Sequence, residues 1–333
     1  MANQDQDMNQ AAGKTADQVA DKQKTIQQQQ DRKDAQEKKP ESEQAVQTGI
    51  DQPAPPFPQQ HLAKPGLEAE MALKPRFMAE QYKGSGKLEG QAAIVTGADS
   101  GIGRAVAVLF AREGADVAVM YLNEHEDAAE TKRCIEAEGR RCITIAGDVK
   151  DPAFCNAAVE QAVAAFGRLD VLVNNAAFQE HAGSLLDITD ERLDETFRTN
   201  IYGYFHMARA ALPHLKRGAA IVNTGSVTGL KGSGKLLDYS STKGAIHAFT
   251  MSLAASLVDQ GIRVNAVAPG PVWTPLNPAD QSPDKIKDFG AGTTYKRPAQ
   301  PEELSPAYVF LASSVCSGYI TGIVLPVTGV VGE

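Results

Sequence analysis

The stretch Ala92–Gly103 reads AAIVTGADSGIG and joins an apolar run to a glycine-rich turn. Its first residues, Ala92–Val95, have the length and composition of a buried strand. A helix is predicted to follow over Arg104–Arg112. Glycines in such a turn let the backbone approach a pyrophosphate, and the free N–H groups of a helix N-terminus favour an anion. Glycine-rich turns are common, so the position of this one between a strand and a helix is what gives it meaning.

Short apolar runs alternate with amphipathic stretches along the chain from Lys87 onward. The expected strands are Ala92–Val95, Val117–Tyr121, Cys142–Ala146, Val171–Val173, Ala220–Val222, Val264–Ala268 and Ile323–Val327. The helical stretches begin near Ile102, Asp127, Pro152, Arg192, Ser240 and Pro301. Because parallel strands need crossover helices, this alternation predicts a doubly wound α/β fold of the Rossmann type. We expect a seven-stranded, mostly parallel sheet with helices on both faces.

Composition excludes several classes of protein. The chain has 333 residues, 42% of them apolar, and a net charge of −8, which argues against general nucleic-acid binding. Four cysteines without C-x-x-C pairs and six scattered histidines predict cytosolic thiols and no metal site. Because the chain has no N-terminal apolar segment and no long uncharged apolar span, we expect a cytoplasmic protein without membrane insertion.

The chain changes composition sharply near residue 60. Residues 1–60 are rich in Gln, Asp and Lys and end in a Pro-rich run, so they predict a disordered tail. Residues 61–84 form an N-terminal arm that is apolar enough to pack against something, through Leu67, Met71, Leu73, Phe77 and Met78. Residues 85–333 have the size of one α/β domain.

A possible acid–base site lies between Asn223 and His247. Ser226 follows an apolar run, and Tyr239 and Lys243 stand four residues apart at the start of a helical stretch. One helical turn therefore places the phenol beside the ammonium. A nearby cation lowers a tyrosine pKa, which would make Tyr239 a proton donor and acceptor near neutral pH. The spacing alone also occurs by chance on amphipathic helices, so the surrounding motifs must support it.

Other polar residues fall at predicted strand ends, where open α/β folds bind their ligands. Asp148 and Val149 follow the third strand, and Asn174-Asn175-Ala176-Ala177 ends the fourth. For the two asparagines, turn formation is an alternative role. Residues 269–274, PGPVWT, close the sixth strand and open a Pro-rich stretch to about Arg297, which is either a surface loop or a substrate lid.

Taken together, these motifs resemble the short-chain dehydrogenase/reductase family. The matching residues, in family order, are Thr96-Gly97-(x)₃-Gly101-Ile102-Gly103, Asn174-Asn175-Ala176-Ala177, Asn200, Ser226, Tyr239-x-x-x-Lys243 and Pro269-Gly270. The resemblance covers residues 85–333. The segment Tyr82–Leu88 and the loop Gly97–Ser100 resemble an extended bacterial branch that includes general stress proteins.

The resemblance implies a role for each matched residue. Tyr239 would be the general acid/base, Lys243 would lower its pKa and bind the nicotinamide ribose, Ser226 would orient the substrate oxygen, and Asn200 would hold a relay water. The implied cofactor contacts are Gly97, Ser100, Gly101, Ile102, Gly103, Tyr121, Asp148, Val149, Asn174, Ala176, Tyr239, Lys243, Pro269, Gly270, Val272 and Thr274. The implied cofactor is NAD or NADP, which carries out the hydride transfer.

This chain departs from the family pattern at three places. Ala177 stands where the family has glycine, and Thr328-Gly329-Val330 replaces the usual Asp-Gly-Gly. Tyr121 stands where an acid usually selects NAD, with Leu122 beside it. Glu124 is expected to point to solvent and Arg104 to lie on a helix surface. We therefore expect NAD and NADP both to bind, with a discrimination of about 1–3 kcal/mol.

The resemblance implies an NAD(P)-dependent oxidoreductase that interconverts an alcohol and a ketone or aldehyde. Two alternatives are a non-catalytic dinucleotide sensor and a stress-protective protein that acts through its tail. The small-molecule substrate is expected to contact Phe178, Gln179, Lys231, Leu236 and Trp273. A dimer or a homotetramer is expected through the helices carrying Asn200 and Tyr239, with apolar contacts from Ile201, Phe205, Ile246 and Phe249.

Overall fold

The computed structural model describes Gln28, Arg32 and residues 44–329. The chain divides into two units, Met1–Gln44 and Ala45–Glu333. In the first unit, Gln28 and Arg32 are helical and exposed. The predicted disorder of residues 1–43 otherwise lies outside the described residues. The second unit contains the α/β domain and the segment that leads into it.

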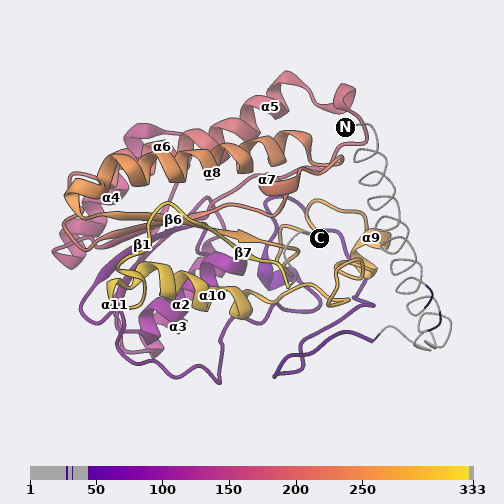
Figure 1. Cartoon of the computed structure of the whole chain (residues 1–333), viewed down its shortest axis with the longest axis horizontal. Coiled ribbons are helices and arrows are strands. Elements are labelled where there is room, and N and C mark those ends of the chain that lie inside the picture. The colour runs from indigo at the N-terminus through magenta and orange to yellow at the C-terminus, as the bar shows by residue number, and fades with distance from the viewer. Residues whose placement is uncertain (1–27, 29–31, 33–43, 330–333) are drawn as a thin grey trace, which may run out of the picture. The chain divides into compact units, whose positions relative to one another are not determined.

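One parallel sheet forms the centre of the second unit (Figure 1). Its strands are β1 (Ala92–Thr96), β2 (Asp116–Tyr121), β3 (Cys142–Ala146), β4 (Val171–Asn174), β5 (Ala220–Thr224), β6 (Arg263–Pro269) and β7 (Val324–Val327). They lie in the order β3-β2-β1-β4-β5-β6-β7, and every neighbouring pair is parallel. The predicted seven-stranded, doubly wound sheet is confirmed.

Helices cover both faces of the sheet (Figure 1). One face carries α2 (Gly101–Arg112), α3 (His125–Ala137) and α10 (Pro301–Ala312), and the other carries α4 (Pro152–Phe166), α6 (Gly203–Ala211) and α8 (Leu237–Leu257). Between α4 and α6 the chain forms α5 (Asp190–Phe197) and a π-helical turn, η3 (Arg198–Tyr202). The remaining short elements are η1 (Glu68–Glu70), η2 (Leu185–Asp187), α7 (Thr228–Lys231), η4 (Val258–Gln260), α9 (Pro283–Lys287) and α11 (Ser314–Ser317).

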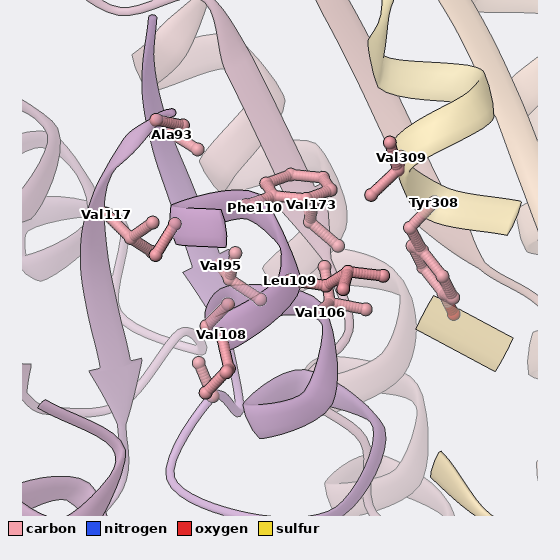
Figure 2. Packing of buried hydrophobic residues seen from close by; sticks show 14 of the residues in the cluster. Ala93, Val95, Val106, Val108, Leu109, Phe110, Val117, Val173, Tyr308 and Val309 are labelled. Carbon is pink, nitrogen blue, oxygen red and sulfur yellow. The ribbon is translucent and has the colours of Figure 1, made fainter. Parts of the chain in front are cut away.

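The strands are mostly apolar because both faces of the sheet are covered. In β1, Ala93 and Val95 belong to the core beneath α2 and α10, whereas Ala92 and Ile94 belong to the core beneath α4, α6 and α8. This division follows from the two-residue period of a strand. Figure 2 shows the first core, where side chains of α2 such as Leu109 and Phe110 lie near Tyr308 and Val309 of α10.

The N-terminal segment packs against the domain from residue 45 onward, so the predicted tail boundary at residue 60 is wrong. Phe57 is only 4% exposed and stacks on Trp273, with ring centroids 4.3 Å apart. Leu62 and Met71 are buried in the same cluster. Few apolar residues precede position 60, but one aromatic ring in a well-matched slot buries enough surface to hold the segment.

Three expected absences can be compared with the described residues. Within residues 44–329, no helix has the length and apolarity needed to cross a membrane. The same residues contain no group of His, Cys, Asp and Glu side chains arranged to hold a metal ion. The four cysteines are unpaired thiols, and Cys134, Cys142 and Cys155 are buried.

Candidate active site

A central cleft opens at the carboxyl edge of the sheet, where β1 and β4 are neighbours. The chain winds outward in opposite directions from these two strands, so their loops separate and leave a crevice. Predicted site residues that line the central cleft are Gly97, Ser100, Gly101, Ile102, Tyr121, Asp148, Val149, Ala176, Tyr239, Lys243 and Thr274, together with Phe178 of the expected substrate pocket. Ala177, the departure from the family pattern, lines it too.

The glycine-rich turn is shaped by close backbone contacts. A Cβ atom on Gly103 would lie 1.9 Å from the Gly97 carbonyl oxygen, so Gly103 serves the packing of α2 against the turn and does not line the cleft. Gly97 itself has a φ of +61° and packs directly against Ala176, whose Cα would lie 3.0 Å from a Cβ atom at position 97. Asn175 fixes this arrangement because its Nδ2 donates to the carbonyl oxygens of Thr96, at 3.1 Å, and Gly97, at 3.0 Å.

Besides Gly103, four of the predicted cofactor contacts lie outside the central cleft. Asn174 is 1% exposed and donates from Nδ2 to Asn223 Oδ1 at 3.0 Å, so its neighbour Asn175 takes the cleft position. Strand alternation turns these two side chains to opposite faces. Val272 is buried in the apolar core. Pro269 ends β6, and Gly270 lines a second hollow with Thr328 and Gly329.

Lys243 is almost fully buried at the base of the cleft, with 1% of its surface exposed. Its Nζ donates to the Thr224 carbonyl oxygen at 2.8 Å and lies 5.3 Å from the centre of the Tyr239 ring. Tyr204 donates to the same carbonyl oxygen at 3.1 Å. Burial of the ammonium lowers the pKa of Lys243 to about 7. The helical spacing of Tyr239 and Lys243 therefore brings them together as expected.

Burial opposes the predicted lowering of the Tyr239 pKa. Burial raises the pKa of this phenol above its usual value, the Ser226 hydroxyl opposes the rise, and the charge of Asp280 adds to it. Desolvation disfavours the phenolate and the ammonium alike, and it is the largest cause of the pKa shift of each group. The sequence showed the spacing of the two groups but not how deeply both are buried.

Ser226 sits in a turn built around His247. The Ser226 hydroxyl accepts hydrogen bonds from the Thr228 N–H at 3.1 Å and the Thr228 hydroxyl at 3.0 Å, while the Ser226 N–H donates to His247 Nε2 at 3.4 Å. A Cβ atom on Gly225 would lie 2.3 Å from His247 Nε2, so the turn must carry glycine there. His247 was not predicted as a site residue, although it lies one helical turn beyond Lys243.

Asn200 lies in the π-helical turn η3 and is fully buried. Its Oδ1 accepts from the Phe178 N–H at 2.7 Å, and its Nδ2 donates to the Phe178 carbonyl oxygen at 2.9 Å and to Thr242 Oγ1 at 3.1 Å. π-Turns within helices are frequent at functional sites. In this structure the Asn200 side chain fixes the cleft residue Phe178 against α8, and the implied relay water remains a prediction.

The expected substrate contacts are only partly brought together. Phe178 lines the central cleft, whereas Gln179 and Leu236 are buried outside it and Lys231 is exposed. Trp273 packs on Phe57 and donates from Nε1 to the Leu73 carbonyl oxygen at 3.0 Å, so its expected place in the pocket is wrong. Trp273 packs instead against the N-terminal segment, and the sequence did not reveal that contact.

Two buried carboxyl groups lie at the end of the cleft beside β2. Glu124 is 6% exposed and lines the cleft with Tyr121 and Asp99, so the expectation that it points to solvent is wrong. Burial and, secondarily, the charge of Glu124 raise the pKa of Asp99 to about 7. The expectation that Arg104 lies on a helix surface is also wrong, because Arg104 is 4% exposed and pairs with Glu68 and Asp127.

Comparison with known proteins places this architecture in one family. Residues 97–329 match the family profile described as enoyl-(acyl carrier protein) reductase. The uncharacterized oxidoreductase YhdF of Bacillus subtilis is 55% identical over 272 residues, which are 82% of this chain and 94% of the relative. General stress protein 39 of the same organism is 52% identical over 266 residues, covering 80% and 93%.

A plant enzyme and two solved structures are also similar. The chloroplastic NADPH-dependent aldehyde reductase 1 of Arabidopsis thaliana is 48% identical over 277 residues, 81% of this chain and 96% of the relative. A short-chain dehydrogenase from Burkholderia cenocepacia in complex with NADP has a TM-score of 0.69 and 35% identity, covering 73% of this chain and 98% of its own. Carveol dehydrogenase from Mycobacterium avium in complex with NAD has a TM-score of 0.68 and 31% identity, and the match covers 73% of this chain and 98% of its own. The chain belongs to the short-chain dehydrogenase/reductase family.

Proposed function

We propose that this protein is an NAD(P)-dependent oxidoreductase that interconverts an alcohol and a ketone or aldehyde, with Tyr239 as general acid/base. The observation that carries the proposal is the position of Tyr239 and Lys243 in the cleft that the glycine-rich turn also lines. A hydrogen bond from the Ser226 hydroxyl lowers the pKa of Tyr239 and so favours its phenolate. A proton-transfer group and a dinucleotide site thus share one cavity.

The residues of the central cleft suit a bound nicotinamide dinucleotide. The turn Gly97–Gly101 lines the cleft, and α2 begins at its last residue, so that backbone and a helix N-terminus are presented where a pyrophosphate would lie. Among the predicted contacts, Ser100, Ile102, Val149, Ala176 and Thr274 line the same cavity. When bound, the cofactor supplies or accepts the hydride.

In this mechanism the protein handles the proton. Tyr239 donates its phenolic proton to the substrate oxygen during carbonyl reduction and takes it back during alcohol oxidation. Ser226 orients that oxygen by hydrogen bonding, and protonated Lys243 favours the phenolate as it forms. The names of relatives support carbonyl or alcohol substrates: besides the aldehyde reductase, the glucose and ribitol dehydrogenase of Daucus carota is 48% identical over 278 residues. No observation favours a sensor or a tail-borne protective function.

Replacing Tyr239 with Phe should abolish turnover and leave cofactor binding and folding nearly unchanged, because only the transferable proton is removed. The loss should be at least about 10²-fold in kcat, the usual contribution of a general acid. Activity is measured by the absorbance of the reduced nicotinamide with a panel of alcohols, aldehydes and ketones. Tyr319→Phe, a change at a fully exposed tyrosine, is the matched control. Wild-type turnover by Tyr239→Phe would contradict the mechanism.

Lys243→Met should change how stability depends on pH. Folded Lys243 has a pKa of about 7, whereas an unfolded lysine titrates near 10.4. Between these values the unfolded chain holds a proton that the folded chain lacks, so raising the pH favours folding of the wild type. Relative to the variant, its free energy of unfolding should rise by up to about 1.4 kcal/mol per pH unit. Urea denaturation from about pH 7 to pH 10 measures this, and parallel pH profiles for the two proteins would refute it.

The acidic end of the cleft points to NAD as the preferred cofactor. A 2′-phosphate placed beside Tyr121 would meet the carboxyl groups of Asp99 and Glu124. Lys150 and Lys243 are the basic side chains among the described cleft residues, and Lys150 is already paired with Glu195 at 2.6 Å. The Arabidopsis relative carries NADPH in its name, so the preference must come from this chain's own residues and not from the family.

We expect NAD to bind about 10- to 200-fold more tightly than NADP, since like charges near the 2′-phosphate oppose its binding. Glu124→Gln should reduce that ratio by removing a buried negative charge. Glu126→Gln, a neighbouring change at an exposed position, should leave the ratio unchanged. Isothermal titration calorimetry of each protein with both cofactors gives the ratios. Tighter binding of NADP by the wild type would show that the acidic end does not select the cofactor.

We also propose a cytoplasmic homo-oligomer, a dimer or tetramer built through α6 and α8. Phe205 is 49% exposed and its ring lies 4.1 Å from that of Phe249, while Tyr202 and Met251 are 52% and 51% exposed. Ile246 is fully buried in its own domain, so the expectation that it contributes to the interface is wrong. Sedimentation velocity should show a dimer or tetramer that Phe205→Glu weakens. A monomeric wild type would contradict the assembly.

A further inference from the structure

The segment Lys64–Glu68 of the N-terminal arm, which we call the strap, forms part of the wall of the central cleft. Pro65 and Gly66 line the cleft directly. The residues at the two ends of the strap, Lys64 and Glu68, are each bonded to the α/β domain, and they contact different sides of the cleft. The strap is thus attached to the α/β domain at both of its ends.

Glu68 anchors one end of the strap to the glycine-rich turn. Its Oε2 accepts from the Gly101 N–H at 2.7 Å, and its Oε1 pairs with Arg104 Nη1 at 2.5 Å. Asp127 completes the anchor by accepting from the Glu68 N–H at 2.6 Å and the Ala69 N–H at 3.0 Å. The Glu68 and Arg104 side chains are only 2% and 5% exposed. Breaking a buried pair of this kind leaves an uncompensated charge, so this end is held firmly.

Lys64 anchors the other end to the segment that follows β4. Its Nζ donates to the Gln179 carbonyl oxygen at 2.7 Å, pairs with Glu180 at 3.0 Å and lies 5.3 Å from the centre of the Phe178 ring. The Lys64 and Glu180 side chains are 32% and 35% exposed. Ion pairs with this much access to water contribute little to stability, so the Lys64 end is the weaker of the two.

Between the anchors, the strap lies in direct contact with the segment after β6. A Cβ atom on Gly66 would lie 2.9 Å from the Pro275 carbonyl oxygen and 3.0 Å from Ala279 Cβ. Pro275 and Leu276 line the same cleft. A side chain at position 66 would therefore force the strap away from its partner, and the φ of +98° at Gly66 adds a second reason for glycine there.

The strap is an addition to the part of the chain that defines the family. The matched family profile spans residues 97–329, and the strap lies before it. The structure complexed with NADP is matched over 98% of its length but covers only 73% of this chain, about the share that residues 85–333 represent. The strap therefore lies outside the segment that the profile describes, and its contacts with the cleft are a feature of this chain's own structure.

We propose that the strap closes the central cleft over the bound dinucleotide and slows its release, opening at the Lys64 end while the Glu68 end stays attached. This inference rests on the proposed function, because it assumes that the cleft holds a nicotinamide dinucleotide. The strap lies on the glycine-rich turn at one end and on Phe178–Glu180 at the other, and a ligand lying between these two regions is enclosed by it. Lid opening of this kind often limits the release of a ligand.

The test measures the rate at which NADH leaves the full-length protein, by stopped-flow displacement monitored through NADH fluorescence. Lys64→Ala removes the weaker anchor and should speed NADH release by about 3- to 10-fold, the range expected for one partly exposed, charge-assisted contact. Lys64→Arg keeps the positive charge and should release NADH at nearly the wild-type rate. Lys83→Ala, a change at an exposed lysine of the arm, is the matched control.

A second pair of variants tests the firm anchor. Glu68→Gln removes the charge that pairs with Arg104 and should also speed release, with Glu70→Gln as the exposed control two residues away. Melting temperatures are recorded for all variants, because a purely structural role predicts a loss of stability without faster release from Lys64→Ala.

The outcomes distinguish the strap from the function on which it rests. Faster release from Lys64→Ala at an unchanged melting temperature, restored by Lys64→Arg, supports the strap. NADH that binds the wild type and leaves Lys64→Ala at the same rate overturns the strap and leaves the proposed function standing. If the wild type binds neither NADH nor NADPH, both are overturned.

Discussion

The site depends on a crevice between β1 and β4, two neighbouring parallel strands. The chain continues from them toward opposite edges of the sheet, so their loops separate. The turn after β1 supplies the glycine backbone, and the end of β4 supplies Asn175 and Ala176. The hydrogen bonds of Asn175 to Thr96 and Gly97 join the two strand ends into one surface. Tyr239 and Lys243 reach this surface from the first turns of α8.

Burial controls the chemistry of the site as strongly as proximity does. Lys243 and Tyr239 lie one helical turn apart, yet desolvation favours the neutral form of each. The same argument applies at the other end of the cleft, where burial raises the pKa of Asp99 next to Glu124. At the buried pair of Glu68 and Arg104, burial likewise raises the pKa of Glu68, while the contact with Arg104 and the Gly101 N–H donor oppose that rise. The proposed mechanism, the proposed cofactor preference and the Glu68 end of the strap thus all involve charged groups held out of water.

Local sequence patterns were enough to predict the sheet and the meeting of the two central site residues. The seven strands, their parallel direction and the glycine-rich turn come from alternation and periodicity, and the meeting of Tyr239 with Lys243 comes from helical geometry. Prediction failed where the answer depended on contacts between distant segments. Phe57 stacks on Trp273, Arg104 pairs with Glu68, and Glu124 lines the cleft. No local sequence pattern encodes these contacts. The sequence could have identified Asn175 rather than Asn174 as the cleft residue, because strand alternation allows only one of the two to face the cleft.

The measurement that tests the proposed mechanism most directly is the transfer of deuterium from NADH deuterated at C4 of the nicotinamide. The full-length protein is incubated with this cofactor, or its NADPH counterpart, and a panel of aldehydes and ketones, and the products are analysed by mass spectrometry. The mechanism predicts an alcohol that carries the deuterium on the former carbonyl carbon, formed by the wild type and not by Tyr239→Phe. A protein that binds the cofactor but yields no deuterated alcohol from any carbonyl compound would contradict it.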